Sequence, residues 1–310
     1  MASRWPECVQ IREVGPRDGL QNEPGFVPTA VKLDWIGRLA DAGLSYIEVT
    51  SFVSPKWIPP LADAEEVAAG LRRREGVTYA ALVPNMRGLE RALRSGIDEA
   101  AVFMSASETH NRRNINKSIG ETLPVLREVT AAAKAAGKTV RGYLSTVFGC
   151  PYEGAVDTQQ VVRLTEALLE MGVREVSLGD TIGIGHPRQV EAVLEELLGR
   201  VPPDRLALHF HDTNGLALAN TVVALQMGIR TFDASCGGLG GCPYAPGAAG
   251  NVATGDLIRM LHAMGVRTCV DEAGLSEASA YILQALARTG GDPGAAAGDC
   301  LTGGDRDVCS

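Results

Sequence analysis

Residues Met171–Gly199 read MGVREVSLGDTIGIGHPRQVEAVLEELLG, and this stretch carries the pattern that decides the fold. A helix is expected to end at the pair Met171-Gly172, because glycine commonly stops helices. A short apolar strand is expected over Glu175–Gly179, and after a glycine-rich turn a new helix over Pro187–Gly199. The same order of strand, loop, helix and stop repeats along the chain, and it is the unit from which parallel sheets are built.

Eight such units are expected. The predicted strands are Val9–Gly15, Tyr46–Phe52, Thr78–Val83, Glu99–Ser105, Thr139–Phe148, Glu175–Gly179, Leu206–Phe210 and Thr231–Cys236. The helices expected after them are Ala30–Ala42, Ala62–Arg73, Gly88–Ser95, Ser118–Ala136, Asp157–Met171, Pro187–Gly199, Leu216–Met227 and Ala253–Ala263. Eight units predict a closed (β/α)8 TIM barrel, with a further helix, Ser276–Ala287, as a C-terminal extension. A doubly wound sheet is the weaker alternative, because no GxGxxG loop follows the first strand.

Length and composition fit one large domain. The 310 residues are 45% hydrophobic but only 5% aromatic, which favours helices packed on a sheet over an aromatic-rich sandwich. We expect a single catalytic barrel domain over residues 1–288, and a flexible tail rich in Gly, Ala and Asp over residues 289–310. The net charge of −8 gives no indication of a nucleic acid or an anionic membrane as a partner.

The seven cysteines are scattered and lack CxxC spacing. This distribution predicts reduced thiols and a cytoplasmic protein, rather than a structural zinc site or a disulfide framework. The N-terminus lacks the apolar segment of a secretory signal, and the first strand is expected too early for a mitochondrial presequence. No apolar run reaches the roughly 18–20 residues of a membrane helix, so no membrane partner is expected.

In a TIM barrel the catalytic groups lie at the carboxyl ends of the strands, and in this chain those ends are unusually polar. His209 and His211 are two residues apart on a strand, so their side chains leave the same face. Such a pair is typical of a metal site, although hydrogen-bonded histidines at the barrel mouth are the alternative. Asp18 and Asn251 can add oxygen ligands from neighbouring loops. The mixed set favours Mg²⁺ or Mn²⁺.

Four further residues are candidates for catalysis. Cys242 lies in the glycine-rich segment Gly237–Asn251, which predicts a mobile lid and a thiol of lowered pKa; the alternative is a small residue in a tight turn. Arg17 precedes Asp18 and suits a developing oxyanion, unless it forms only a surface ion pair. Glu48 and Asp180 are either part of the reaction or simply hydrogen-bonded carboxylates of a polar barrel mouth.

Several long motifs carry a resemblance to a known family. They are VGPRDGLQNE (Val14–Glu23), SLGDTIG (Ser177–Gly183), HFHDTNGLALAN (His209–Asn220) and GLGGCPYAPGAAGNVATGDL (Gly238–Leu257). Over about residues 8–285 the chain closely resembles the 3-hydroxy-3-methylglutaryl-CoA lyases. These belong to a wider superfamily of metal-dependent barrel lyases, aldolases and Claisen-type synthases, and the cysteine loop indicates the lyase branch.

The resemblance implies both a site and a reaction. By resemblance, the metal ligands are Asp18, His209, His211 and Asn251, and the other active-site positions are Arg17, Glu48, Asp180 and Cys242. The implied enzyme cleaves an acyl-CoA substrate, 3-hydroxy-3-methylglutaryl-CoA, to acetoacetate and acetyl-CoA, and a homodimer is also implied. We expect His209, alone or together with Asp180, to take the hydroxyl proton, Arg17 to stabilise the enolate and Cys242 to protonate it.

Three other functions stay open. The same chemistry on a longer 3-substituted 3-hydroxyglutaryl-CoA is the nearest alternative. A synthase that condenses acetyl-CoA with a 2-oxo acid is disfavoured, because too few residues follow the lid helix for the regulatory domain such enzymes commonly carry. A barrel that only binds would tolerate the loss of a ligand or of the cysteine, and here every matched position is filled.

Overall fold

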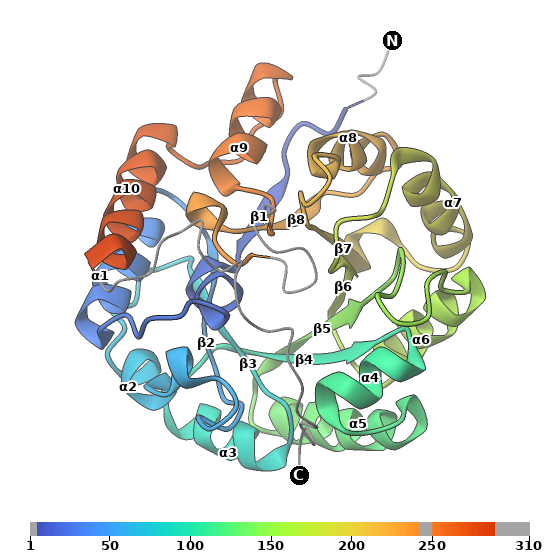
Figure 1. Ribbon diagram of the computed structural model, residues 1–310, viewed down its shortest axis with the longest axis horizontal. Coiled ribbons are helices and arrows are strands. Elements are labelled where there is room, and N and C mark those ends of the chain that lie inside the picture. The colour runs from blue at the N-terminus through green and yellow to red at the C-terminus, as the bar shows by residue number, and fades with distance from the viewer. Residues whose placement is uncertain (1–4, 242–249, 289–310) are drawn as a thin grey trace.

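The eight predicted strands form and close into one parallel barrel, in the order β1 to β8, in the computed structural model, which describes residues 5–241 and 250–288 (Figure 1). The strands are β1 (Gln10–Glu13), β2 (Tyr46–Ser51), β3 (Thr78–Leu82), β4 (Glu99–Ser105), β5 (Thr139–Ser145), β6 (Glu175–Asp180), β7 (Leu206–Phe210) and β8 (Thr231–Ala234). Four residue pairs between β1 and β8, from Gln10↔Thr231 to Glu13↔Ala234, close the barrel. The expected TIM barrel is therefore confirmed.

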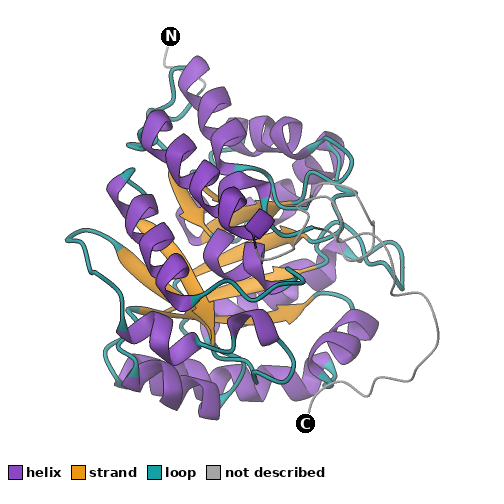
Figure 2. Ribbon diagram, turned by 60° about the vertical axis from the view of Figure 1, so that its left-hand side comes forward, coloured by secondary structure: helices purple, strands orange, loops and turns teal. Residues whose placement is uncertain are grey.

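Helices form a ring around the strands in Figure 1, and Figure 2 shows helices packed outside the strands. They are α1 (Thr29–Asp41), α2 (Ala64–Ala69), α3 (Met86–Arg94), α4 (Glu108–Ile115), α5 (Ile119–Ala135), α6 (Thr158–Glu170), α7 (Pro187–Leu198), α8 (Ala217–Gln226), α9 (Thr254–Ala263) and α10 (Glu272–Arg288). Short helical turns are η1 (Gly15–Gly19), η2 (Pro59–Leu61), η3 (Pro203–Arg205) and η4 (Cys236–Gly238). In the described part of the chain, no helix is long and apolar enough to cross a membrane.

The glycines expected to stop helices do so by adopting positive φ. Gly43, Gly137, Gly172 and Gly228 have φ of 94°, 75°, 101° and 93°. This region of backbone conformation is open to glycine without a steric penalty, so each helix turns sharply into the next strand.

Two differences from the predicted elements affect the site. The first strand ends at Glu13, and the residues after it form the π-helical turn η1, which carries Arg17 and Asp18 into the barrel mouth. Helix α4, which was not predicted, lies between β4 and α5 and is capped by the side chain of Ser107, which accepts from the N–H of His110.

The predicted C-terminal helix is confirmed and begins four residues earlier than expected, as α10, which packs beside α1 (Figure 1). The guanidinium of Arg38 on α1 lies 4.4 Å from the ring centre of Tyr281 on α10. The predicted tail over residues 289–310 lies outside the described residues. Four cysteines fall within them, Cys8, Cys150, Cys236 and Cys269, and all four are free thiols.

Inside the barrel, the structure buries charge as well as apolar groups. The layer between strands and helices is built from Val, Leu, Ile and Ala side chains. The interior instead holds Arg141 from β5, which pairs with Glu175 on β6 and with Asp233 on β8. Arg141 and Asp233 are almost completely buried. Buried charges need partners of opposite sign, and here each has one.

Candidate metal centre and active site

A cavity of about 380 Å³ opens at the carboxyl ends of the strands. Its lining includes Arg17, Asp18, His209 and His211. Arg17 and Asp18 follow β1, whereas His209 and His211 lie almost 200 residues later, at the end of β7. They meet because closure of the barrel places β1 and β7 on either side of β8. The location is the one where TIM-barrel enzymes place their active sites.

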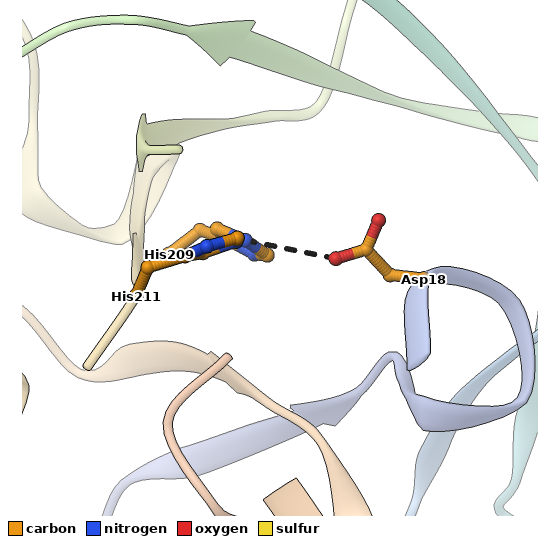
Figure 3. Close-up of side chains that lie close together, drawn as sticks. All are labelled: Asp18, His209 and His211. Carbon is orange, nitrogen blue, oxygen red and sulfur yellow. Dashed lines mark ion pairs between the residues drawn. The ribbon is translucent and has the colours of Figure 1, made fainter. Parts of the chain in front are cut away.

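Three of the four predicted metal ligands form a cluster. Asp18, His209 and His211 each offer one ligand atom, and these atoms all lie within 4.8 Å of one another. The two imidazoles have ring centres 5.2 Å apart, and in Figure 3 both face Asp18 across a gap. Nε2 of His209 lies 3.9 Å from Oδ2 of Asp18. This spacing leaves room for a cation between the rings and the carboxylate.

The charges of these groups suit a cation. Burial alone would raise the pKa of Asp18, but Arg17 and the two histidines lower it to about 2, so the carboxylate is ionised. Burial, with the neighbouring His209, lowers the pKa of His211 to about 3, so its ring is neutral at physiological pH. No described residue hydrogen-bonds the buried Nδ1 of His211. Metal ligands bind in their deprotonated forms, so a neutral imidazole beside an ionised carboxylate suits a divalent cation.

Asn251, the fourth predicted ligand, also reaches this cluster. It pairs with His211 in a β-bridge, and its Nδ2 donates to Oδ2 of Asp18 over 2.8 Å and to the carbonyl of Leu239 over 3.2 Å. The amide nitrogen therefore faces Asp18 in this structure. Coordination of a cation through Oδ1 requires the amide to turn around.

Arg17 is held between two carboxylates. Its Nε donates to Oε2 of Glu48 over 2.7 Å, and its Nη1 donates to Oδ1 of Asp18 over 2.5 Å. The hydroxyl of Tyr143 donates to the same Oε2 of Glu48 over 3.0 Å. Burial alone would lower the pKa of Arg17, but Glu48 and Asp18 raise it. The guanidinium is thus charged, fixed in orientation by Glu48 and in contact with the cavity.

Asp180 ends β6, and both its oxygens accept hydrogen bonds from the loop that follows. Oδ2 accepts from the N–H of Gly185 over 2.8 Å and Oδ1 from the N–H of Ile184 over 3.1 Å. Burial raises its pKa to about 6, although these N–H groups act in the opposite direction. The carboxyl group titrates close to neutral pH but faces its own loop. Cys242 lies outside the described residues.

The structure also brings to the site residues to which the sequence analysis gave no role. Asp233 lies beside His209, its neighbour in the β7–β8 register, and Arg141 and Ser177 contact Asp233. His110 on α4 lines the cavity, and its Nδ1 lies 2.6 Å from Oγ of Ser105. The strand alternation that placed His209 inside also places Arg141, Tyr143 and Ser145 on one face of β5, and this signal was available in the sequence.

A parallel barrel with an aspartate–histidine–histidine cluster at its mouth defines a TIM-barrel protein with a candidate divalent-metal centre. Comparison with known proteins identifies its family. The sequence profile of the HMGL-like family matches residues 8–282, and this chain belongs to that family.

Its relatives include named enzymes, some of which have known crystal structures. The chain is 61% identical to the hydroxymethylglutaryl-CoA lyase YngG of Bacillus subtilis over 284 residues, which are 92% of this chain and 95% of the relative. The crystal structure of the Bacillus subtilis HMG-CoA lyase matches with a TM-score of 0.91 over 91% of this chain and 95% of that one. An HMG-CoA lyase from Acinetobacter baumannii in complex with coenzyme A and 3-methylmalate is 40% identical, with a TM-score of 0.87 over 93% of each chain.

Proposed function

We propose that this enzyme cleaves 3-hydroxy-3-methylglutaryl-CoA to acetoacetate and acetyl-CoA, with Mg²⁺ or Mn²⁺ bound by Asp18, His209, His211 and Asn251. The observation that carries the proposal is the cluster of three of these ligands beside a fixed arginine, in a chain 61% identical to a hydroxymethylglutaryl-CoA lyase. An acyl-CoA substrate is supported by the related structure that holds coenzyme A.

The reaction breaks the bond between C2 and C3 of the substrate. A divalent cation held by Asp18, His209, His211 and Asn251 would supply Lewis acidity to this cleavage. Asp180 is the proposed acceptor of the C3 hydroxyl proton, because a carboxyl group of pKa about 6 exchanges protons readily near neutral pH. The sequence favoured His209 for this role, but its Nδ1 contacts Asp233 and its Nε2 faces the proposed cation, so the ring has no free nitrogen for the proton. As the proton leaves, C3 becomes the ketone of acetoacetate, and the electrons of the C2–C3 bond pass into the thioester enolate.

The enolate needs a positive partner and then a proton. Arg17 is the proposed partner, since its guanidinium stays charged and is held in place by Glu48. Cys242 is the proposed acid that gives a proton to C2 and completes acetyl-CoA. Glu48 thus acts as a positioning residue, and Arg17 and Cys242 act on the reacting atoms.

The first test is release of acetoacetate from 3-hydroxy-3-methylglutaryl-CoA by the purified, metal-stripped protein. We expect little release until Mg²⁺ or Mn²⁺ is added, and loss of release again with a chelator. The Arg17→Gln variant should bind Mn²⁺ but turn over about 10²–10³-fold more slowly, as when one oxyanion donor is removed. No release by protein with Mn²⁺ demonstrably bound would contradict this substrate, and longer 3-substituted 3-hydroxyglutaryl-CoA thioesters would be tried next.

We also propose that the protein is a homodimer and acts in the cytoplasm. The scattered free cysteines support a reducing compartment, and the family likeness supports the dimer. Sedimentation of the full chain tests the first proposal, and localisation of a tagged chain tests the second.

A further inference from the structure

Asp233 on β8 is a buried carboxylate directly behind the candidate metal centre. Its side chain is fully buried, and its Oδ1 accepts from Nη2 of Arg141 over 2.6 Å. Its Oδ2 accepts from Oγ of Ser177 over 2.8 Å and lies 3.3 Å from Nη1 of Arg141. The same Oδ2 lies 3.2 Å from Nδ1 of His209. Arg141, Ser177 and His209 can each donate a hydrogen bond. The ionised carboxylate of Asp233 can only accept one.

This arrangement determines which nitrogen of His209 carries the hydrogen. A carboxylate can only accept, so the contact with Oδ2 requires a hydrogen on Nδ1 of His209. In the neutral ring Nε2 then keeps its lone pair. Nε2 is the atom that faces Asp18, 3.9 Å from its Oδ2. The lone pair needed to coordinate a cation is thus present on the side where the cation would lie.

Asp233 is itself held firmly. Nε of Arg141 donates to Oε1 of Glu175 over 2.8 Å, and the guanidinium carbon lies 4.9 Å from the ring centre of Tyr143 and 5.7 Å from that of Tyr46. A guanidinium held by Glu175 and lying against two aromatic rings cannot easily turn away from Asp233. The carboxylate therefore presents a fixed acceptor to His209.

We propose that Asp233 is a positioning residue that keeps His209 in the Nδ1–H form, so that Nε2 is free to bind a divalent cation, and that Arg141 keeps Asp233 in place. The metal-binding part of this inference rests on the proposed metal centre. The tautomer part concerns the metal-free protein alone, and it can therefore fail or succeed independently of the reaction.

The Asp233→Asn variant keeps the shape of the side chain but removes its charge and replaces one acceptor oxygen by an NH₂ donor. Arg141 can only donate, so the amide oxygen of the variant should take the place of Oδ1 against Nη2 of Arg141. The amide NH₂ group then occupies the place of Oδ2 and donates to Nδ1 of His209. His209 should respond by moving its hydrogen to Nε2, which removes the lone pair from the metal side. A buried His–Asp pair in other enzymes behaves in this way when the aspartate is replaced.

The experiment reads the tautomer by ¹⁵N NMR of the histidines in the metal-free full chain. The chain has five histidines, and a His209→Gln variant assigns the signals of His209 by their loss. Spectra are taken above the pH at which His209 becomes neutral, which the same titration locates. Binding of Mn²⁺ is measured separately by electron paramagnetic resonance. Ser177→Ala is the matched control, because it removes a hydrogen bond to the same Oδ2 and leaves the carboxylate in place.

We expect the Nδ1–H form in the wild type and in Ser177→Ala, and the Nε2–H form in Asp233→Asn. Mn²⁺ affinity should fall about 10–100-fold in Asp233→Asn and change far less in Ser177→Ala. An Nε2–H form in the metal-free wild type overturns the proposal even if Asp233→Asn fails to fold. Wild-type Mn²⁺ affinity in Asp233→Asn also overturns it. Failure of acetoacetate release, with the expected tautomers and Mn²⁺ affinities, contradicts the proposed reaction only.

Discussion

The single buried side chain of Glu13 connects three segments that are far apart in the sequence. Its Oε1 accepts from the N–H groups of Gly15 and Cys236, both over 2.8 Å, and its Oε2 accepts from the hydroxyl of Thr254 over 2.7 Å. One side chain thus fixes η1, η4 and the start of α9. Burial raises its pKa from 4.5 to about 7, although these three donors act in the opposite direction.

This shift predicts a pH-dependent stability. Because the folded pKa lies above the unfolded one, the contribution of Glu13 is fully present below pH 4.5 and is lost as the pH rises through 7. A shift from 4.5 to about 7 corresponds to about 3 kcal/mol. The Glu13→Gln variant cannot ionise, and its amide oxygen can still accept both N–H groups. The free energy of unfolding of the wild type, minus that of the variant, should fall by about 3 kcal/mol between pH 4.5 and 8 in urea titrations. Parallel pH curves would contradict this.

The metal ligands could be predicted from their residue types and their places at the strand ends. Contacts that depend on how neighbouring strands align could not be predicted. Asp18, His209 and His211 stood out because their residue types recur at metal sites and follow strands. Asp233 was given no role, because an isolated aspartate in a short strand has many possible partners. Its contact with His209 depends on how β7 and β8 align, and that register is set by packing around the whole barrel.

At the scale of the elements, two helix stops with almost the same backbone conformation differ in their surroundings. Gly43 and Gly228 have φ of 94° and 93°. A Cβ on Gly43 would lie 2.4 Å from the carbonyl oxygen of Cys269, whereas a Cβ on Gly228 would meet nothing within 4 Å. The first stop is therefore packed against the segment that leads into α10, and the second is open.

The matched variants Gly43→Ala and Gly228→Ala should separate backbone strain from packing. Both residues would place a side chain at positive φ, at a cost of about 1 kcal/mol. Only Gly43→Ala also forces apart α1 and the segment before α10, for a further loss of about 1–3 kcal/mol. Guanidinium unfolding measures both. An equal loss of stability in the two variants would mean that the contact with Cys269 relaxes without cost.

Elements with a clear hydrophobic period were predicted and α4 was not. The segment ETHNRRNI of α4 is polar except for its last residue, Ile115, and has no apolar stripe, so the sequence gives no reason to prefer a helix. Its N-cap by Ser107 and its packing onto β4 form only in the folded protein. This matters for function because α4 brings His110 to the cavity.

At the scale of the whole molecule, alternation of strands and helices was enough to predict the closed barrel. The place of the last helix was not predictable in the same way. An amphipathic pattern identifies the buried face of α10 but not the helix that it packs against, and several outer helices of a barrel offer similar apolar surfaces. The candidate metal centre is also a property of the whole fold, because it joins the turn after β1 to the end of β7.

A cation that binds this centre should therefore stabilise the entire barrel. The unfolded chain does not hold Asp18 near His209 and His211, so binding adds RT ln(1 + [L]/Kd) to the free energy of unfolding. At a free Mn²⁺ concentration of 100 times Kd this is about 2.7 kcal/mol, or roughly 5 °C in Tm for a protein of this size. Calorimetry with and without Mn²⁺ measures the shift, and a chelator should reverse it.

Two histidine variants show whether the stabilisation comes from this site. His211→Ala removes one ligand and, since no described residue hydrogen-bonds its Nδ1, should leave a stable barrel that Mn²⁺ no longer stabilises. His262→Ala changes a partly exposed histidine of α9 that contacts Glu272 and Thr268 and is not part of the cluster. This variant should keep the full shift in Tm. If His211→Ala also keeps it, the cation binds elsewhere, and the cluster at the barrel mouth is not the metal centre.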